Sequence, residues 1–284
     1  MPAKVIDGKK VAEKIYKKLN DAIFDLNEQL IEPGLAIIQI GNDPASEVYV
    51  EKKIEKAKEL GLFAKRVPMT SSVSFEQVAE QIKKLNGDDT IHGMIVQMPL
   101  PKQLDPVKVM ELINPEKDVD GFSSVNQGRL FAGKPYFVPA TPKGIIELIK
   151  STGTKIEGKN CVIVGRSNIV GKPIAMLLLN ENATVTICHS KTKNLAGVTS
   201  KADILVSAVG TPGLIRENMV KKGAVVIDVG TTKIAGKLIG DVDFEKVKKK
   251  AAWITPVPGG VGPVTIASLM QNTVDAAKRK HGLK

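Results

Sequence analysis

The sequence predicts an α/β fold of two domains, each a mainly parallel sheet flanked by helices, with a cleft between them. Three observations support this prediction. The chain has 284 residues, which exceeds the usual size of one domain. Short apolar segments alternate with helical segments, which is typical of parallel sheets covered on both faces. A stretch richer in glycine and proline interrupts the alternation between residues 115 and 144.

Helix-start signals and apolar strands alternate through the first half. Asp43 comes directly before Pro44, a favoured first residue of a helix. Ser74 and Gln77 have the spacing of a capping box. We expect helices at 6–30, 44–61 and 75–86, and strands at 34–41, 65–69 and 91–101.

A second alternating series follows a helix expected at 142–151. Its strands are predicted at 160–165, 183–190, 202–210, 224–230 and 254–260, with a helix starting at Val170. The last helix, 264–280, is expected to pack back on the first domain. We therefore predict a first domain of residues 1–120 together with 264–284, a linker region at 121–144, and a second domain at 145–263.

The composition predicts a soluble protein of the cytoplasm. Apolar residues make up 43% of the chain and charged residues 25%, as in ordinary globular proteins. No apolar run approaches the ~20 residues that span a bilayer, and the segment MPAKVIDGKKVAEKI lacks the apolar core of a signal peptide. Cys161 and Cys188 lie in strand-like runs and are expected to be buried and reduced.

The chain is strongly basic, with a formal net charge of +11 and a pI of about 9.4. Aromatic residues are only 4%, and basic residues do not interleave with them, so we expect no nucleic-acid partner. A positive field also attracts small polyanionic ligands by electrostatic steering.

Lys53 stands out among the four lysines of the segment YVEKKIEKAKELG. At ~100° per residue it alone projects into the apolar arc of the helix, and Tyr49 lies one turn earlier. An inward lysine needs a partner or a shifted pKa, so it is a candidate for acid–base chemistry. The alternative, which this helix alone favours, is a lysine whose stem packs while its ammonium group reaches water.

The segment NCVIVGRSNIVGKPIAMLLL is typical of a dinucleotide-binding strand, glycine turn and helix. Gly165 and Gly171 fit the glycine pattern, but Ser167 stands where a second glycine is usual. A tight turn in any α/β protein is the alternative interpretation.

The next strand indicates which dinucleotide binds. It ends in His189, Ser190 and Lys191, without the acidic residue that usually accepts the ribose hydroxyl of NAD. Arg166 lies in the glycine turn. Cationic and hydroxyl groups suit the 2′-phosphate of NADP, so we expect NADP as the cofactor. His189 itself is expected to be a structural imidazole.

The sequence resembles the methylenetetrahydrofolate dehydrogenase/cyclohydrolase family over essentially its whole length. The motifs that carry the resemblance occur in the family's order: YVEKKIEKAKELG, VQMPLP, PEKDVDGF, VGRSNIVGKP, CHSKT and PGGVGPVT. The resemblance implies NADP-dependent oxidation of 5,10-methylenetetrahydrofolate to the methenyl compound, and hydrolysis of that compound to 10-formyltetrahydrofolate. It also implies a homodimer, a folate substrate with or without a polyglutamate tail, and no metal.

The resemblance assigns substrate roles to several residues. Lys53 is the acid–base residue, Tyr49 orients it and the substrate, and Gln97 holds Lys53. Asp120 accepts hydrogen bonds from the pterin ring. The backbone at Gly259 and Gly260 approaches the ligand closely.

By the same resemblance, the second domain holds NADP through residues after its strands: Gly165, Arg166, Ser167, Ser190 and Thr231. One departure concerns the nicotinamide region, where family members often read IDVGIN and this chain reads IDVGTT. A cyclohydrolase with weak or lost dehydrogenase activity is therefore one alternative. A non-catalytic NADP sensor and an NADP-dependent dehydrogenase for another small substrate are the others.

Overall fold

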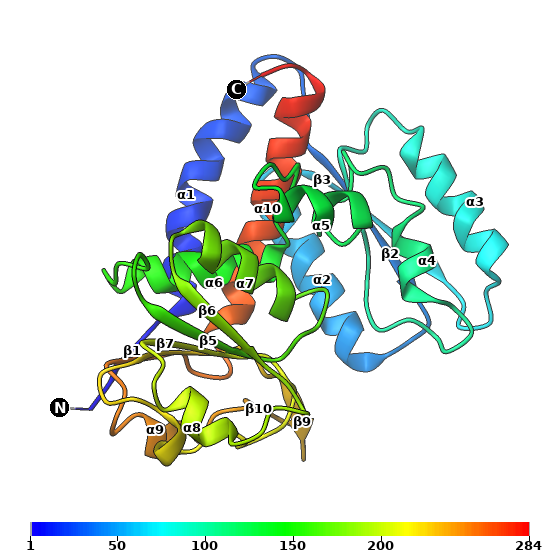
Figure 1. Cartoon of the computed structure of the whole chain (residues 1–284). Helices are drawn as coiled ribbons and strands as arrows, with labels where there is room; N and C mark the ends of the chain where they lie inside the picture. The colour runs from blue at the N-terminus through cyan, green and yellow to red at the C-terminus, as the bar shows by residue number, and fades with distance from the viewer. Residues whose placement is uncertain (1, 284) are drawn as a thin grey trace. The chain divides into compact units, whose positions relative to one another are not determined.

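The computed structural model describes residues 2–283, and the chain forms two compact units (Figure 1). Unit 1 combines Met1–Lys14 with Thr141–Ala267, and unit 2 combines Ile15–Ala140 with Ser268–Lys284. The boundaries therefore fall inside two long helices, α1 (Gly8–Asn27) and α10 (Val261–Lys280).

This division differs from the predicted domains mainly in two places; in addition, residues 264–267, predicted with the first domain, belong to unit 1. The first residues of the chain belong to unit 1 because β1 (Lys4–Val5) pairs with β11 (Trp253–Ile254). Residues 121–140, predicted as part of a linker, belong to unit 2 and contain α5 (Ser124–Phe131). Long-range pairing decides both differences, and a two-residue strand or a two-turn helix leaves little periodicity in the sequence.

Unit 1 is built on a six-stranded parallel sheet with the strand order β1-β11-β8-β7-β5-β6. Besides β1 and β11, its strands are β5 (Asn160–Val164), β6 (Thr184–Cys188), β7 (Ile204–Ser207) and β8 (Val225–Asp228). The chain leaves β5 toward β6 on one side and then returns to β7 on the other. This reversal is the switch point at which such sheets bind dinucleotides.

The central strands of unit 1 are buried, as their continuous apolar runs predict for a parallel sheet covered on both faces. One core cluster includes Val162, Leu205, Val226 and Ile254 from four neighbouring strands. The helices of this unit are α6 (Ala140–Ser151), α7 (Gly171–Asn180), α8 (Leu195–Thr199), α9 (Phe244–Val247) and the 3₁₀ turn η1 (Glu217–Met219). A short antiparallel hairpin, β9 (Thr232–Ile234) and β10 (Lys237–Ile239), follows β8.

Unit 2 contains a three-stranded parallel sheet in which β2 (Gly34–Ile40) lies between β3 (Phe63–Met69) and β4 (Gly93–Val96). Every residue of β2 is buried, so both faces of the sheet are covered. Ala36, Ile38 and Ile40 share a core cluster with residues of α3 (Phe75–Asn86) and α4 (Pro106–Met110). Figure 1 shows α2 (Pro44–Glu59) on the other side of the sheet from α3.

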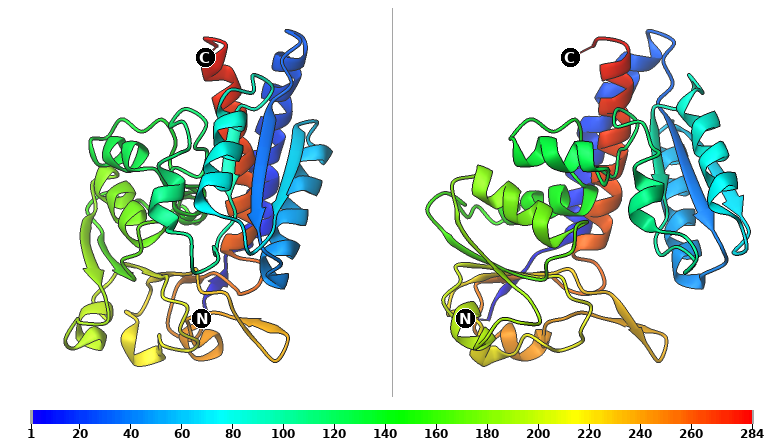
Figure 2. Two further views of the ribbon diagram at one scale, coloured as in Figure 1. Left: turned by 90° about the vertical axis from the view of Figure 1, so that its right-hand side faces the viewer. Right: turned by 45° about the vertical axis from the view of Figure 1, so that its right-hand side comes forward.

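The caps predicted from the sequence are present in unit 2. The Asp43 carboxylate accepts from the Ser46 amide at the start of α2, and Ser74 forms a capping box with Gln77 at the start of α3. The unit 2 portions of α1 and α10 run side by side in both views of Figure 2. Asn272 of α10 donates from Nδ2 to the Val119 and Val138 carbonyls, at 2.8 Å each.

We expect Gly171→Ala to destabilise the protein, because a Cβ at Gly171 would lie 2.3 Å from the Gly165 carbonyl oxygen. Overpacking against backbone typically costs about 1–3 kcal/mol. The measurement is the midpoint of urea unfolding. Gly128→Ala is the matched control: a Cβ there would meet nothing within 4 Å, and alanine within a helix should stabilise by roughly 0.5–1 kcal/mol. A Gly171→Ala variant as stable as wild type would contradict the close approach of Gly171 to the Gly165 carbonyl.

Candidate active site

The Lys53 ammonium group of unit 2 has a specific partner. Lys53 lies on α2, and its Nζ donates to Oε1 of Gln97 at 2.9 Å. Gln97 directly follows β4, where its backbone N–H donates to the Ile38 carbonyl at 2.8 Å. Its own Nε2 donates to the Met98 carbonyl at 2.8 Å, which keeps the amide oxygen turned toward Lys53. The lysine is thus held by a neutral acceptor, which does not require it to be charged.

Burial lowers the pKa of Lys53, and the negative charge of Asp120 opposes this effect. The pKa of Asp120 is raised to about 6, mainly by burial; the positive charge of Lys53 opposes this shift, and the negative charge of Asp118 adds to it. The two groups therefore titrate closer together than a lysine and an aspartate do in water. A basic group and an acidic group of this kind are suited to moving protons near neutral pH.

Asp118 holds the loop that carries Asp120. It is buried, and its carboxylate accepts from the Ser123 amide at 2.8 Å and from Nδ2 of Asn126 at 2.9 Å. The preceding Lys117 carbonyl accepts from the Met94 amide of β4 at 2.7 Å, so the loop is attached to the sheet. Sequence reasoning did not find Asn126, since an asparagine in a short helix carries no signal of its own.

Tyr49 lies on the same helix as Lys53. Tyr49 is half-buried, one turn before Lys53 on α2. Within residues 2–283, the hydrogen bond of Lys53 goes to Gln97 rather than to the Tyr49 hydroxyl. Nearby, Ser46 donates from Oγ to Asp43 Oδ2 at 2.7 Å, and its Oγ lies 3.2 Å from the Met98 carbonyl oxygen. Ser46 therefore ties the start of α2 to the turn after Gln97, a role that the sequence did not suggest.

The glycine turn of unit 1 lies at the switch point between β5 and β7. Gly165 has φ +124°, and a Cβ there would lie 2.4 Å from the Ala208 carbonyl oxygen. Ser167, in the place of a second glycine, accepts through Oγ from the amides of Val170 and Gly171, at 3.2 Å each. Its single hydroxyl hydrogen is left to donate to an anion at this helix start.

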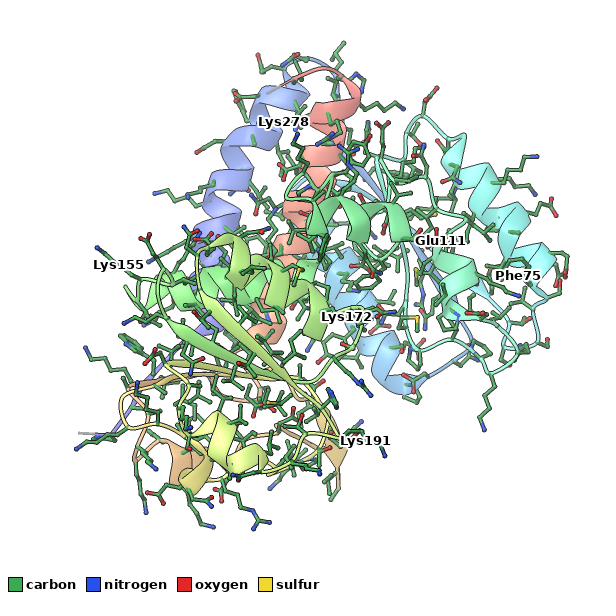
Figure 3. The ribbon with its side chains drawn as sticks, viewed as in Figure 1. Phe75, Glu111, Lys155, Lys172, Lys191 and Lys278 are labelled. Atoms are coloured by element: carbon green, nitrogen blue, oxygen red, sulfur yellow. The ribbon has the colours of Figure 1, made fainter. Side chains whose placement is uncertain are left out.

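Arg166 is exposed in the same turn and forms no ion pair within the described residues. The free guanidinium group, the glycine cradle and the Ser167 hydroxyl together fit a phosphate-bearing dinucleotide. Figure 3 labels Lys172, at the start of α7, whose Nζ donates to Asn168 Oδ1 at 2.7 Å.

A compact turn follows β6. The His189 amide donates to Thr192 Oγ1 at 2.9 Å, and Nδ1 of His189 accepts from the Lys191 amide at 3.2 Å. The imidazole thus takes part in the hydrogen bonds that close this turn. The turn leaves Ser190 and Lys191 exposed at the carboxyl edge of the sheet, and Lys191 is labelled in Figure 3.

The two threonines of IDVGTT have different environments in unit 1. Thr231 is exposed directly beyond Gly230. Thr232 is half-buried and donates from Oγ1 to the Gly210 carbonyl at 3.1 Å, so it joins the loop after β8 to the loop after β7. The Thr232 side chain thus cross-links these two segments.

Gly259 and Gly260 also belong to unit 1. Gly259 has φ +101°, and its carbonyl accepts from the Gly8 amide at 3.0 Å. A Cβ at Gly8 would lie 1.8 Å from the Gly260 carbonyl oxygen, so the start of α1 packs directly on this turn.

The predicted site residues are divided between the two units. One group lies in unit 2 (Tyr49, Lys53, Gln97 and Asp120), and the rest lie in unit 1.

Residues 2–283 contain no cluster of three or more potential metal-ligating side chains. None of the helices within that range is long and apolar enough to cross a membrane.

The fold and the glycine turn define a class of protein: a dinucleotide-binding α/β protein with a Rossmann-type unit and a second α/β unit. Residues 6–120 match the tetrahydrofolate dehydrogenase/cyclohydrolase catalytic domain. Residues 139–281 match the NAD(P)-binding domain of the same family. The chain therefore belongs to the tetrahydrofolate dehydrogenase/cyclohydrolase family, and the resemblance seen in the sequence is confirmed.

Individual relatives agree over the full length. The chain is 52% identical over 285 residues to the bifunctional protein FolD of Acetivibrio thermocellus, with 100% of each chain covered. The crystal structure of the bifunctional FolD enzyme from Campylobacter jejuni matches with a TM-score of 0.95 and 43% identity, covering 98% of this chain and 99% of that one. The Trypanosoma brucei FolD structure, complexed with NADP and an inhibitor, matches with a TM-score of 0.95 and 41% identity, covering 99% of each.

We expect Lys53→Met to raise the pKa of Asp120 above its value of about 6, because the nearby positive charge that lowers it is removed. The carboxyl band of Asp120 can be followed by difference infrared spectroscopy between pH 5 and 8, with Asp120→Asn identifying the band. Lys52→Met, at an exposed position of the same helix, is the control and should leave the titration unchanged. An Asp120 band that titrates identically in Lys53→Met would show that the two charges do not interact.

Proposed function

We propose that this chain oxidises 5,10-methylenetetrahydrofolate with NADP and hydrolyses the methenyl product to 10-formyltetrahydrofolate. Family membership over both units supports the two activities. The single observation that carries the assignment to residues is the Lys53 side chain, which is bonded to Gln97 and electrostatically coupled to Asp120.

In the hydrolysis, Lys53 is the acid–base residue. Its lowered pKa gives it a neutral fraction that can accept a proton from water as the water oxygen bonds to the methenyl carbon. The resulting ammonium group can then protonate N5 as the bond from that carbon to N5 breaks. The hydroxyl of the intermediate releases its proton as the formyl carbonyl forms. The net change is one methenyl cation and one water converted to 10-formyltetrahydrofolate and one proton.

Gln97 and Tyr49 support this role. The Gln97 oxygen accepts a hydrogen bond from Lys53 whether the lysine is charged or neutral, so it fixes the nitrogen while favouring the charged form less than a carboxylate would. Tyr49, half-buried one turn away, is placed to orient the substrate beside Lys53. In this scheme, Lys53 alone carries the proton that passes from the attacking water to N5.

Asp120 is the proposed acceptor for the pterin ring. With a pKa of about 6 it is mostly ionised at pH 7 and accepts from the N–H groups of the pterin. Below pH 6 the protonated form predominates and loses part of this acceptor capacity, so folate affinity falls on acidification. We further propose that backbone at Gly259 and Gly260 lines the folate site.

NADP is the proposed cofactor, and it supplies the hydride acceptor when bound. Gly165 leaves room for the pyrophosphate at the start of α7, and Ser167 can donate to it. Arg166 and Ser190, both exposed beyond their strands, bind the 2′-phosphate. Thr231 is assigned to the nicotinamide end of the site.

Further parts of the proposal concern the assembly and its setting. We propose a homodimer, because two large apolar side chains are exposed where a second copy could cover them. Ile187 on the edge strand β6 is 36% exposed, and Leu179 on α7 is 52% exposed. The net charge of +11 favours substrates with acidic polyglutamate tails. The free, buried cysteines Cys161 and Cys188 fit a reducing compartment such as the cytoplasm.

Lys53→Met should abolish hydrolysis of the methenyl compound while leaving NADP affinity nearly unchanged. General acid–base help is typically worth ~10²–10⁴-fold, so a loss of that size is expected. The decay of methenyl absorbance measures the rate, and calorimetry measures NADP binding. Lys52→Met is again the matched control, because it removes the same charge from an exposed position. Hydrolysis within a few-fold of wild type would end the assignment of Lys53.

Arg166→Ala should lower the preference for NADP over NAD by about 10–100-fold, as expected from losing a charged hydrogen bond worth ~1.5–3 kcal/mol. The measurement is the ratio of kcat/KM for the two cofactors at one ionic strength. Lys193→Ala is the control: it removes one exposed positive charge from the loop after β6 and should leave the ratio unchanged. Two results would contradict the assignment of Arg166 to the 2′-phosphate: a wild-type preference for NAD, or an equal fall of kcat/KM for both cofactors in Arg166→Ala.

A further inference from the structure

Two buried aspartates of unit 1 are not explained by the roles assigned so far. Asp241, which follows β10, is fully buried. Its Oδ2 accepts from Ser207 Oγ at 3.0 Å and from the Val209 amide at 2.8 Å, and its Oδ1 accepts from the Thr211 amide at 2.7 Å. All three donors lie at the end of β7 or in the loop that follows it. One carboxylate therefore fixes the path of this loop.

Asp228, the last residue of β8, holds Asp241 in turn. Its Oδ1 accepts from the Asp241 amide at 2.9 Å and from the Gly230 amide at 3.0 Å, and its Oδ2 accepts from the Val242 amide at 2.9 Å. Its own amide donates to Thr255 Oγ1 at 2.7 Å, just beyond β11. The hydrogen bonds thus run from β11 through Asp228 and Asp241 to the loop after β7.

Two glycines leave the space that these carboxylates occupy. A Cβ at Gly240 would lie 2.0 Å from Asp228 Oδ2, and a Cβ at Gly230 would lie 2.3 Å from Asp241 Oδ1. Neither carboxylate forms an ion pair within residues 2–283; backbone amides and one serine hydroxyl satisfy them instead. Both carboxylates are buried and each accepts three hydrogen bonds from inside the protein, so any role toward a ligand is exerted through the loops that they hold.

The loops that they hold lie at the switch point of the sheet. A Cβ at Gly165 would lie 2.4 Å from the Ala208 carbonyl oxygen, so the glycine turn after β5 contacts the loop after β7. Gly210 of that loop accepts from Thr232 in the loop after β8. In doubly wound sheets, the first half binds the adenosine portion and the half beyond the switch point takes the other nucleotide. Val209, Gly210 and Thr231 are exposed there.

We propose that Asp241 is a positioning residue for the nicotinamide half of the dinucleotide site, and that Asp228 positions Asp241. The carboxylate acts by holding Val209–Thr211 in the shape that receives the nicotinamide nucleotide, while the adenosine half is left to the turns after β5 and β6. This inference rests on the proposed use of NADP.

The test compares two ligands by calorimetry on the full-length protein. NADP occupies both halves of the site, whereas adenosine 2′,5′-bisphosphate occupies only the adenosine half. Asp241→Asn replaces an acceptor by an amide N–H that faces amide donors, so it should weaken NADP binding about tenfold, equivalent to ~1.4 kcal/mol. Binding of the bisphosphate should stay within about twofold of wild type. The loss of one hydrogen bond to this ligand would weaken its binding about tenfold, so a twofold limit separates the two cases.

Asp203→Asn is the matched control. Asp203 also accepts a backbone amide, that of Asn160 at 3.0 Å, and a Lys221 hydrogen bond, but at the amino ends of β5 and β7. It should change neither affinity. Ser207→Ala is a milder variant that removes one donor to Asp241 without burying an unpaired amide, and it decides the matter if Asp241→Asn does not fold.

The outcomes are distinct. Selective loss of NADP affinity in Asp241→Asn or Ser207→Ala supports the inference. Unchanged NADP affinity, or equal weakening of both ligands, overturns it and leaves the aspartates a purely structural role. A wild-type protein that binds neither ligand would instead refute the proposed function.

Discussion

The direction of the parallel strands is the constraint on which both units depend. In a parallel sheet every carboxyl end reaches the same edge, so residues far apart in sequence meet there. Gln97 follows β4 in unit 2, while Arg166, Ser190 and Thr231 follow β5, β6 and β8 in unit 1. Polar residues of several short loops are therefore collected at this edge, and the buried apolar strands behind them supply the rigidity.

Local patterns made much of this predictable. Continuous apolar runs located the central strands, cap signals at Asp43 and Ser74 located two helices, and the helical arc singled out Lys53. What the sequence could not reveal were contacts between distant residues. The pairing of β1 with β11, the bond from Asn126 to Asp118, and the bonds that join Asp228 to Asp241 all depend on tertiary packing. The lysine–glutamine contact was expected only through the family resemblance.

Lys53 and Asp120 illustrate how burial and charge act together on neighbouring titratable groups. Burial alone pushes the pKa of the lysine down and that of the carboxylate up, toward each other. Their mutual attraction works against this convergence and keeps the charged pair accessible. A neutral hydrogen-bond acceptor, Gln97, leaves that balance intact where a third charge would shift it.

The carboxylates of the two units show that burial by itself does not make an aspartate reactive. Burial raises the pKa of Asp228 to about 6, as it does for Asp120, although three backbone amides oppose the shift at Asp228. The difference lies in what remains open: the acceptor positions of Asp228 are filled by amides of its own unit, whereas Asp120 has an oppositely charged lysine nearby instead. A carboxylate saturated by backbone donors can only shape loops, and one with spare acceptor capacity can bind a ligand. Hydrogen bonding from within the unit, more than burial or pKa, therefore distinguishes Asp228 and Asp241 from Asp120.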